Sequence, residues 1–131
     1  MAAAESYPDY LKYHQDHDRA RLEGDEAVLG ITWYAADSLG ELVHFEPPEV
    51  GATVSKDQAY GEVESVKAVS DVIAPLSGEV LEVNGGVVDA PETVNEDPYG
   101  AGWLIRIRVS DAGEADALLD VAAYKQVLAD S

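Results

Sequence analysis

The stretch GEVESVKAVSD, residues 61–71, places a single lysine between two arms that each contain valine. Lys67 is one of only four lysines in a chain of 131 residues. Successive side chains of an extended arm face opposite sides, so Val63 is expected on one face and Glu62 and Glu64 on the other. The stretch is therefore predicted to form a β-hairpin that holds Lys67 at its bend, away from the core.

The chemistry open to this lysine follows from its place on an exposed bend. Schiff-base and general-base lysines are desolvated into sites that disfavour the ammonium form, and a solvent-facing bend does not provide such a site. A lysine on a bend can, however, be reached and acylated by another enzyme. The alternative is an edge-strand lysine that discourages aggregation.

Composition limits the partners of the chain. A hydrophobic fraction of 47% fits a globular protein, and eight basic against twenty-six acidic residues give a net charge of −18. Such a charge repels phosphate backbones, so nucleic acid is not expected as a partner. The acidity is expected either to steer the protein toward positively charged partner surfaces or to keep it soluble in a salty cytoplasm. Both explanations remain open.

The residues that are missing also exclude functions. The chain has no cysteine, which excludes disulfides, thiolate zinc sites and cysteine nucleophiles, so any sulfur chemistry must arrive on a prosthetic group. No apolar run reaches membrane-spanning length, and the N-terminus shows no targeting pattern, so a cytoplasmic protein without a membrane partner is expected. Residues 1–9 are expected to be a flexible N-terminus, followed by one domain over residues 10–131.

Short apolar segments separated by turn residues predict a chain dominated by β-strands. Thr32 is expected to cap a single helical turn that Gly40 ends. Asn84–Gly86 is interpreted as a tight turn, and residues 89–102 as a loop. Strands are predicted at 26–32, at 41–45, within 56–65, twice within 69–83 and at 103–109. The last of these alternates, so Ile105 and Ile107 are expected to face the core, and Leu104, Arg106 and Arg108 to face outward.

The C-terminal segment changes from strand to helix periodicity. Leu118, Val121, Ala122 and Leu128 recur at roughly helical spacing, and Asp120 is expected to cap a second helix after a first short one. The predicted fold is thus mainly β: a small β-sandwich or flattened barrel, with a short helical turn and a C-terminal helix.

Four segments in order resemble the H-protein of the glycine cleavage system. VESVKAVSD (63–71), followed by PLSGEVLEVN (75–84), is similar to that family's lysine hairpin. GITWYAADSLGELVHFEPPEVG (30–51), NEDPYGAGWLIRI (95–107) and LKYHQDHD (11–18) resemble three further family segments. The resemblance runs from about residue 8 to residue 128. It implies the barrel-sandwich fold of lipoyl domains.

In that family the lysine carries an amide-linked lipoyl group, so the resemblance implies lipoate on Lys67, as N6-lipoyllysine. Glu64, Ser65, Val66 and Ala68 are the hairpin residues that flank it. Biotin carriers flank their lysine with methionines, whereas valine and alanine stand here, which favours lipoate over biotin.

The resemblance also implies the function and the partners. The chain would be a monomeric, non-catalytic carrier that moves the aminomethyl group of glycine. Its partners would be the pyridoxal-phosphate enzyme glycine decarboxylase, an aminomethyltransferase and dihydrolipoyl dehydrogenase. A lipoate ligase or a lipoyl/octanoyl transferase would attach the cofactor.

The family folds the loaded arm into a cleft lined by acids, and two residues match that role by resemblance. Asp71 follows the lysine by four residues, and Asp18 stands where the family has the glutamate of His-Glu-Trp. The alternative is that both are solvated surface carboxylates. Arg19 replaces the tryptophan of that motif, while Trp33 stands where an acid is common, which suggests that aromatic surface has moved from one position to the other.

Other interpretations remain. The changed residues near Asp18 leave open a related lipoyl carrier, or a lipoate relay, that serves another oxidative pathway. A binding module without lipoate is a further alternative. His14 and His17 could bind a metal only if both turned to one side, and the expectation is a polar edge without metal. His44 is expected to point outward. No arrangement of catalytic residues is recognised.

Overall fold

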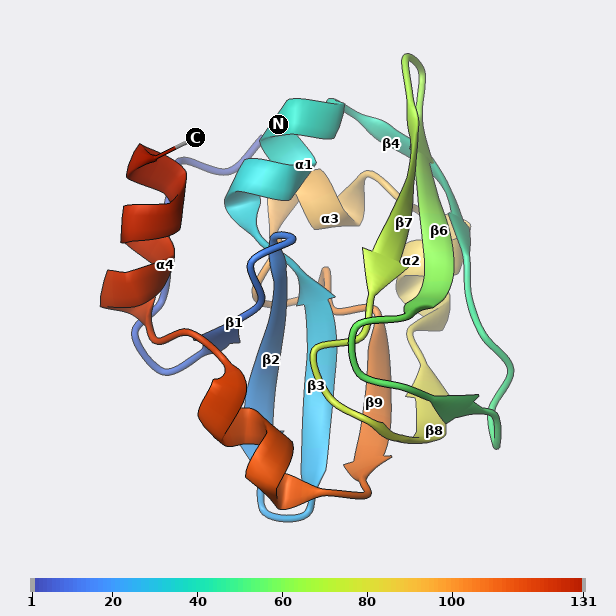
Figure 1. Cartoon of the computed structure of the whole chain (residues 1–131). Helices are drawn as coiled ribbons and strands as arrows, with labels where there is room; N and C mark the ends of the chain where they lie inside the picture. Colours follow the sequence, from blue (N-terminus) through green and yellow to red (C-terminus); the bar gives the residue numbers. More distant parts are fainter. Residues whose placement is uncertain (1, 131) are drawn as a thin grey trace.

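The computed structural model describes residues 2–130, which form two antiparallel β-sheets (Figure 1). The larger sheet has the strand order β1-β2-β3-β9-β8-β5, and the smaller has the order β4-β6-β7. The larger sheet contains β1 (Lys12–Tyr13), β2 (Asp18–Glu23), β3 (Glu26–Ile31), β5 (Thr53–Val54), β8 (Gly78–Val83) and β9 (Ile105–Val109). The smaller contains β4 (Leu42–Glu46), β6 (Ala59–Ser65) and β7 (Val69–Ile73).

The two sheets share one hydrophobic core. Leu29 and Ile107 of the larger sheet belong to the same buried cluster as Phe45, Val63 and Val72 of the smaller one. Because each strand turns alternate side chains inward, the two inner faces together supply the apolar layer between the sheets. The predicted mainly β sandwich is confirmed, and the two sheets do not close into a barrel.

Strand β9 follows the predicted alternation of inward and outward side chains except at Leu104. Ile105 and Ile107 are buried, whereas Arg106 and Arg108 point outward, as the alternation predicted. Leu104 was expected on the outward face, and this was wrong, because it lies before the strand begins and is fully buried.

Helix α1 (Trp33–Leu39) forms where its caps predicted it. The Thr32 hydroxyl accepts a hydrogen bond from the Ala35 amide, and the Gly40 amide donates to the Ala36 carbonyl. Gly40 has φ 84° and ψ −167°, a conformation that side chains strongly disfavour. Both the predicted cap and the predicted stop are confirmed.

Two short helices correct the loop predictions. Asn84 caps α2 (Gly85–Asp89) by accepting from the Gly86 amide, so the expected tight turn was wrong. Helix α3 (Thr93–Glu96) lies within the segment expected to be a loop. Val87 and Val94 are fully buried, and this tertiary burial stabilises helices too short to form alone.

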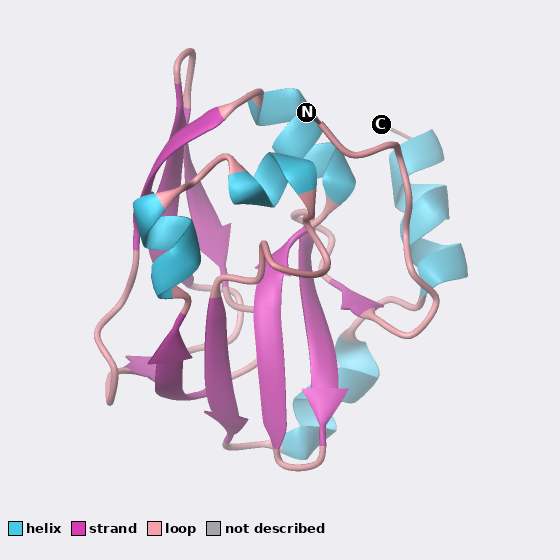
Figure 2. Ribbon diagram, turned by 180° about the vertical axis from the view of Figure 1, so that it is seen from behind, coloured by secondary structure: helices cyan, strands magenta, loops and turns pink. Residues whose placement is uncertain are grey.

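The C-terminal segment forms the 3₁₀-helix η1 (Ala112–Ala117) and helix α4 (Val121–Ala129), as predicted. The Asp120 side chain caps α4 by accepting from the Ala123 amide. Tyr124 anchors this helix, because its ring stacks on that of Tyr13 with centroids 4.6 Å apart. Figure 2 shows α4 beside the edge of the larger sheet, while α1 and α3 lie together at one end of the long strands.

Residues 2–9 form no helix or strand but are hydrogen-bonded to the domain. The Ala3 amide donates to the Asn95 carbonyl, and the Trp33 indole donates to the Ala3 carbonyl at 2.7 Å. The Tyr99 hydroxyl donates to the Ser6 carbonyl. Any motion of this segment has to break these bonds. Among the described residues, no helix has both the length and the apolar character needed to cross a membrane.

Replacing Gly61 by alanine is expected to destabilise the protein by about 1–3 kcal/mol, because a β-carbon at this position of β6 would collide with the Glu46 carbonyl of β4. Gly85→Ala is the matched control, since a β-carbon there meets no atom within 4 Å. Its effect is expected to stay within about 0.5 kcal/mol. Urea unfolding of both variants measures the difference, and equal free energies of unfolding would contradict the close approach of β4 to β6.

Candidate functional site

The predicted lysine hairpin is present as strands β6 and β7. Glu62 pairs with Asp71 and Glu64 with Val69 across the two strands. Val63 is buried against the core, whereas the three carboxylates face outward and are exposed, as the alternation predicted. One side of the hairpin therefore holds it in place, and the other presents negative charge to the solvent.

Ser65 closes the bend at the end of β6. Its hydroxyl oxygen accepts hydrogen bonds from the Lys67 amide at 3.3 Å and the Ala68 amide at 3.1 Å. The Ser65 amide donates to the Ala68 carbonyl at 2.8 Å. These bonds satisfy the backbone polar groups of the bend within the hairpin itself.

The hairpin of β6 and β7 projects from the domain (Figure 1), and Lys67 lies in the bend between these two strands. Its side chain is exposed, as are Ala68 and Val66, of which the valine is 80% exposed. The structure gives the Lys67 ammonium neither an ion pair nor a side-chain hydrogen bond with any residue from 2 to 130. This amine is thus available to a modifying enzyme, as an acylation site requires.

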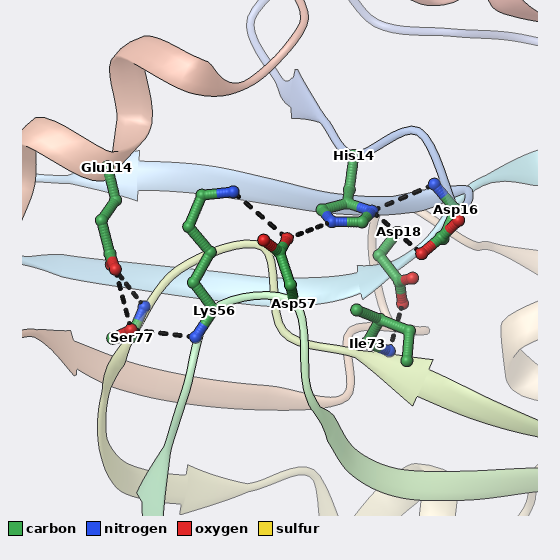
Figure 3. Close-up of polar contacts among 8 residues, drawn as sticks. All are labelled: His14, Asp16, Asp18, Lys56, Asp57, Ile73, Ser77 and Glu114. Carbon is green, nitrogen blue, oxygen red and sulfur yellow. Dashed lines mark hydrogen bonds and ion pairs between the residues drawn. The ribbon is translucent and has the colours of Figure 1, made fainter.

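The two carboxylates expected near the arm are both close to β7: Asp71 belongs to this strand, and Asp18 of β2 is hydrogen-bonded to it. Asp71 is exposed on this strand, whereas Asp18 comes from β2 and is 2% exposed. An Asp18 carboxylate oxygen accepts a hydrogen bond from the Ile73 amide at 3.1 Å, two residues beyond Asp71 (Figure 3). Burial raises the pKa of Asp18 well above its usual value, and the bond from Ile73 only partly opposes this.

Arg19, which replaces the tryptophan of the family motif, is buried in the interior. It is 1% exposed, donates to the Pro98 carbonyl at 2.6 Å and lies over the Tyr99 ring. Gly30 on the neighbouring strand makes room for it, because a β-carbon there would lie 2.8 Å from the guanidinium. Burial lowers the pKa of Arg19. Trp33 instead contacts the N-terminal segment.

The two histidines of the polar edge point to different partners. The His14 ring accepts from the Asp16 amide at Nδ1, so its Nε2 carries the proton and donates to Asp57 at 2.7 Å (Figure 3). This hydrogen bond lowers the pKa of Asp57. Nδ1 of His17 instead lies 2.8 Å from the Tyr124 hydroxyl.

Over residues 2–130 no group of three or more potential ligands could hold a metal ion. His44 points outward beside Glu46, as expected.

A link that the sequence did not indicate joins η1 to the segment just before β8. The Glu114 carboxylate of η1 accepts from the Ser77 amide at 2.8 Å and from its hydroxyl at 2.9 Å (Figure 3). The Ser77 hydroxyl oxygen also accepts from the Lys56 amide. These bonds fasten the C-terminal segment to the loops below the hairpin. No sequence motif distinguishes Glu114 from the other acidic residues around it, so this link could not be predicted.

A sandwich of two antiparallel sheets that presents one lysine on a projecting hairpin defines the class of lipoyl-domain-like proteins. The family model of the glycine cleavage H-protein matches residues 11–131, and the chain belongs to this family.

Proteins named glycine cleavage system H protein are similar along nearly the whole chain. The one from Myxococcus xanthus is 47% identical, over 98% of this chain and 99% of that protein. The one from Halorhodospira halophila is 52% identical, over 94% and 95%. A crystal structure of a glycine cleavage system H protein from Mycobacterium marinum matches with a TM-score of 0.87 and 43% identity. It covers 94% of this chain and 99% of that one.

Asp18→Asn is expected to remove a pH-dependent loss of stability. Because the folded-state pKa of Asp18 is raised, its contribution to stability is fully present below the unfolded pKa, about 4, and is lost as the pH rises through the folded pKa. Asparagine keeps an oxygen that can accept from the Ile73 amide. The free energy of unfolding of wild type should therefore fall relative to that of Asp18→Asn as the pH rises above about 4.

Urea unfolding at several pH values measures this difference. Asp71→Asn is the matched control, since Asp71 is exposed on the adjoining part of β7. Its profile gives the reference for removing a carboxylate that is exposed rather than buried. Parallel profiles for wild type and Asp18→Asn would show that the buried carboxyl does not titrate as described.

Proposed function

We propose that this chain is the lipoyl carrier of a glycine cleavage system, with lipoate joined by an amide bond to Nζ of Lys67. The observation that carries the proposal is an exposed ammonium, unpaired among residues 2–130, at the tip of a hairpin whose bend is closed by Ser65. An amine in that place fits a covalent group that must extend into a partner's active site. Family membership supports the same assignment.

Acylation of Lys67 would change the tip in two ways. Forming the amide removes the positive charge of the ammonium, so the hairpin becomes wholly acidic. When bound, the dithiolane supplies redox-active sulfur that can carry the aminomethyl group, and this chain has no cysteine that could do so. Tethering gives an effective concentration of about millimolar for a short flexible arm.

The outward face of the hairpin supports an encounter with several enzymes. Glu62, Glu64 and Asp71 place negative charge beside the lysine, within a chain of net charge −18. Positively charged active-site mouths would attract this face, and salt would weaken the attraction. The proposed partners are glycine decarboxylase, aminomethyltransferase, dihydrolipoyl dehydrogenase and the enzyme that attaches lipoate.

In this proposal the chain breaks no bond itself and acts in the cytoplasm as a monomer. Its own residues hold, orient and shield the arm. Asp71 is placed to pair with a cationic arm that folds back along β7, because its carboxylate is exposed on that strand. For Asp18 the same role requires local opening, since its carboxylate is buried against the Ile73 amide.

Lys67→Ala is expected to abolish lipoylation completely, because it removes the acylated nitrogen. Intact-mass measurement after incubation with lipoate, ATP and a lipoate ligase tests this. Lys125→Ala is the matched control, since Lys125 is also exposed but lies on α4. It should gain one lipoyl group, as wild type does. Wild type that gains no mass, or Lys67→Ala that does, would overturn the proposed site.

A related carrier for another oxidative pathway is the second candidate, because Arg19 and Trp33 depart from the family pattern beside the proposed cleft. Reconstitution of the lipoylated protein with glycine decarboxylase separates the two. Glycine-dependent exchange of carbon dioxide supports the glycine cleavage role. A fully lipoylated protein without exchange would leave only the second candidate.

A further inference from the structure

The stem of Lys67 lies beside the corner that joins α1 to β4. A β-carbon built on Gly40 would lie 3.6 Å from Cε of Lys67, and no other side chain comes as near to that point among the described residues. Gly40 occupies a backbone conformation that is essentially restricted to glycine, so the corner offers a bare backbone surface. The lysine at the tip therefore has a neighbour outside its own hairpin.

One side chain holds both ends of this corner. Asn95 of α3 donates from its amide nitrogen to the Gly40 carbonyl at 2.9 Å and to the Ala36 carbonyl at 3.3 Å. Its amide oxygen accepts from the Leu42 amide at 2.9 Å. These three bonds join the end of the helix to the start of the strand, across the glycine that would otherwise be free to flex.

The same asparagine is connected to the bend by a second route. Leu42 is paired in the sheet with Ser65, the residue whose hydroxyl accepts from the Lys67 amide. Asn95 thus supports the backbone that carries Lys67 and also the corner against which the lysine stem lies. A single side chain sets the relation between these two surfaces.

We propose that Asn95 is a positioning residue for Lys67, which fixes where the lysine nitrogen stands when a modifying enzyme approaches. The inference deepens the proposed function and rests on it only for the lipoylation step. Acylation needs the amine placed against an activated carbonyl, and small misplacements of reacting atoms slow such reactions strongly. Loss of the Asn95 bonds would let the corner and the stem move apart.

Asn84 provides a matched control within the same chain. Its amide nitrogen donates to the Ala101 and Trp103 carbonyls, and its oxygen accepts from the Gly86 amide. The chemistry is the same as that of Asn95: two carbonyls and one backbone amide. None of these three partners belongs to the hairpin or to the Gly40 corner.

The first experiment places Asn95→Asp beside Asn84→Asp in the unmodified protein. Each variant loses two amide donors and adds one negative charge. Nuclear Overhauser effects between the Gly40 α-protons and the Lys67 ε-protons report directly whether the lysine side chain lies against the Gly40 corner. We expect the contact in wild type and in Asn84→Asp, and its loss in Asn95→Asp. Its absence in wild type would overturn the inference, whether or not the lysine is ever lipoylated.

The second experiment measures lipoylation kinetics of the same proteins. Asn95→Asp is expected to lower kcat by about tenfold while KM stays within about twofold, because the nitrogen is misplaced and the docking face is unchanged. Asn84→Asp should keep the wild-type kcat. An equal fall in both variants, or an unchanged kcat in Asn95→Asp, would show that Asn95 has only a structural role.

Misfolding of a variant and failure of lipoylation can each be separated from the role of Asn95. If either aspartate variant fails to fold, Asn95→Ala and Asn84→Ala give the same comparison without the added charge. If wild type is not lipoylated at all, the proposed function fails, while the contact between Gly40 and Lys67 still decides the inference about Asn95.

Discussion

Burial of Val63 and Val72 is the constraint on which the lysine hairpin depends. In the described part of the chain no backbone ladder joins the three-stranded sheet to the six-stranded one, so apolar contact holds them together. Fully burying a valine stabilises a fold by about 1.5–3 kcal/mol. Residues 66–69 of the hairpin are all exposed, which leaves Lys67 projecting from a base that is firmly packed.

The alternation of buried and outward-facing positions along β6 and β7 also explains the charges of the hairpin. Strand β7 is an edge of its sheet among the described residues, and unprotected edges invite pairing with other chains. Outward carboxylates on β6 and β7 oppose such pairing and also suit an encounter with basic partner surfaces. One set of side chains therefore meets a structural need and a functional one.

Much of this architecture could be predicted because its signals are local. The alternation around Val63, the capping hydroxyl of Thr32, the stop at Gly40 and the cap at Asp120 each act within a few residues. A hydrogen bond that a cap side chain accepts from the amide three residues ahead can be inferred from the sequence alone. The lysine site is predictable for the same reason, since its hairpin is closed by its own residues.

What could not be predicted depends on partners distant in the chain. Asn84 looked like a turn residue, but its amide nitrogen is held by carbonyls near residue 102, and this favours a helix cap. The burial of Arg19 depends on the missing side chain of Gly30 and on Pro98. Asn95 lies more than fifty residues from the corner that it holds. Periodicity and propensity carry no information about such pairs.

The cysteine-free body of this protein has a practical consequence for anyone who handles it. If a lipoyl arm is the sole source of thiols, a maleimide dye added after mild reduction would label lipoylated molecules and leave unmodified ones unlabelled. The lipoylated fraction of a preparation could then be read from a gel, without background from the polypeptide.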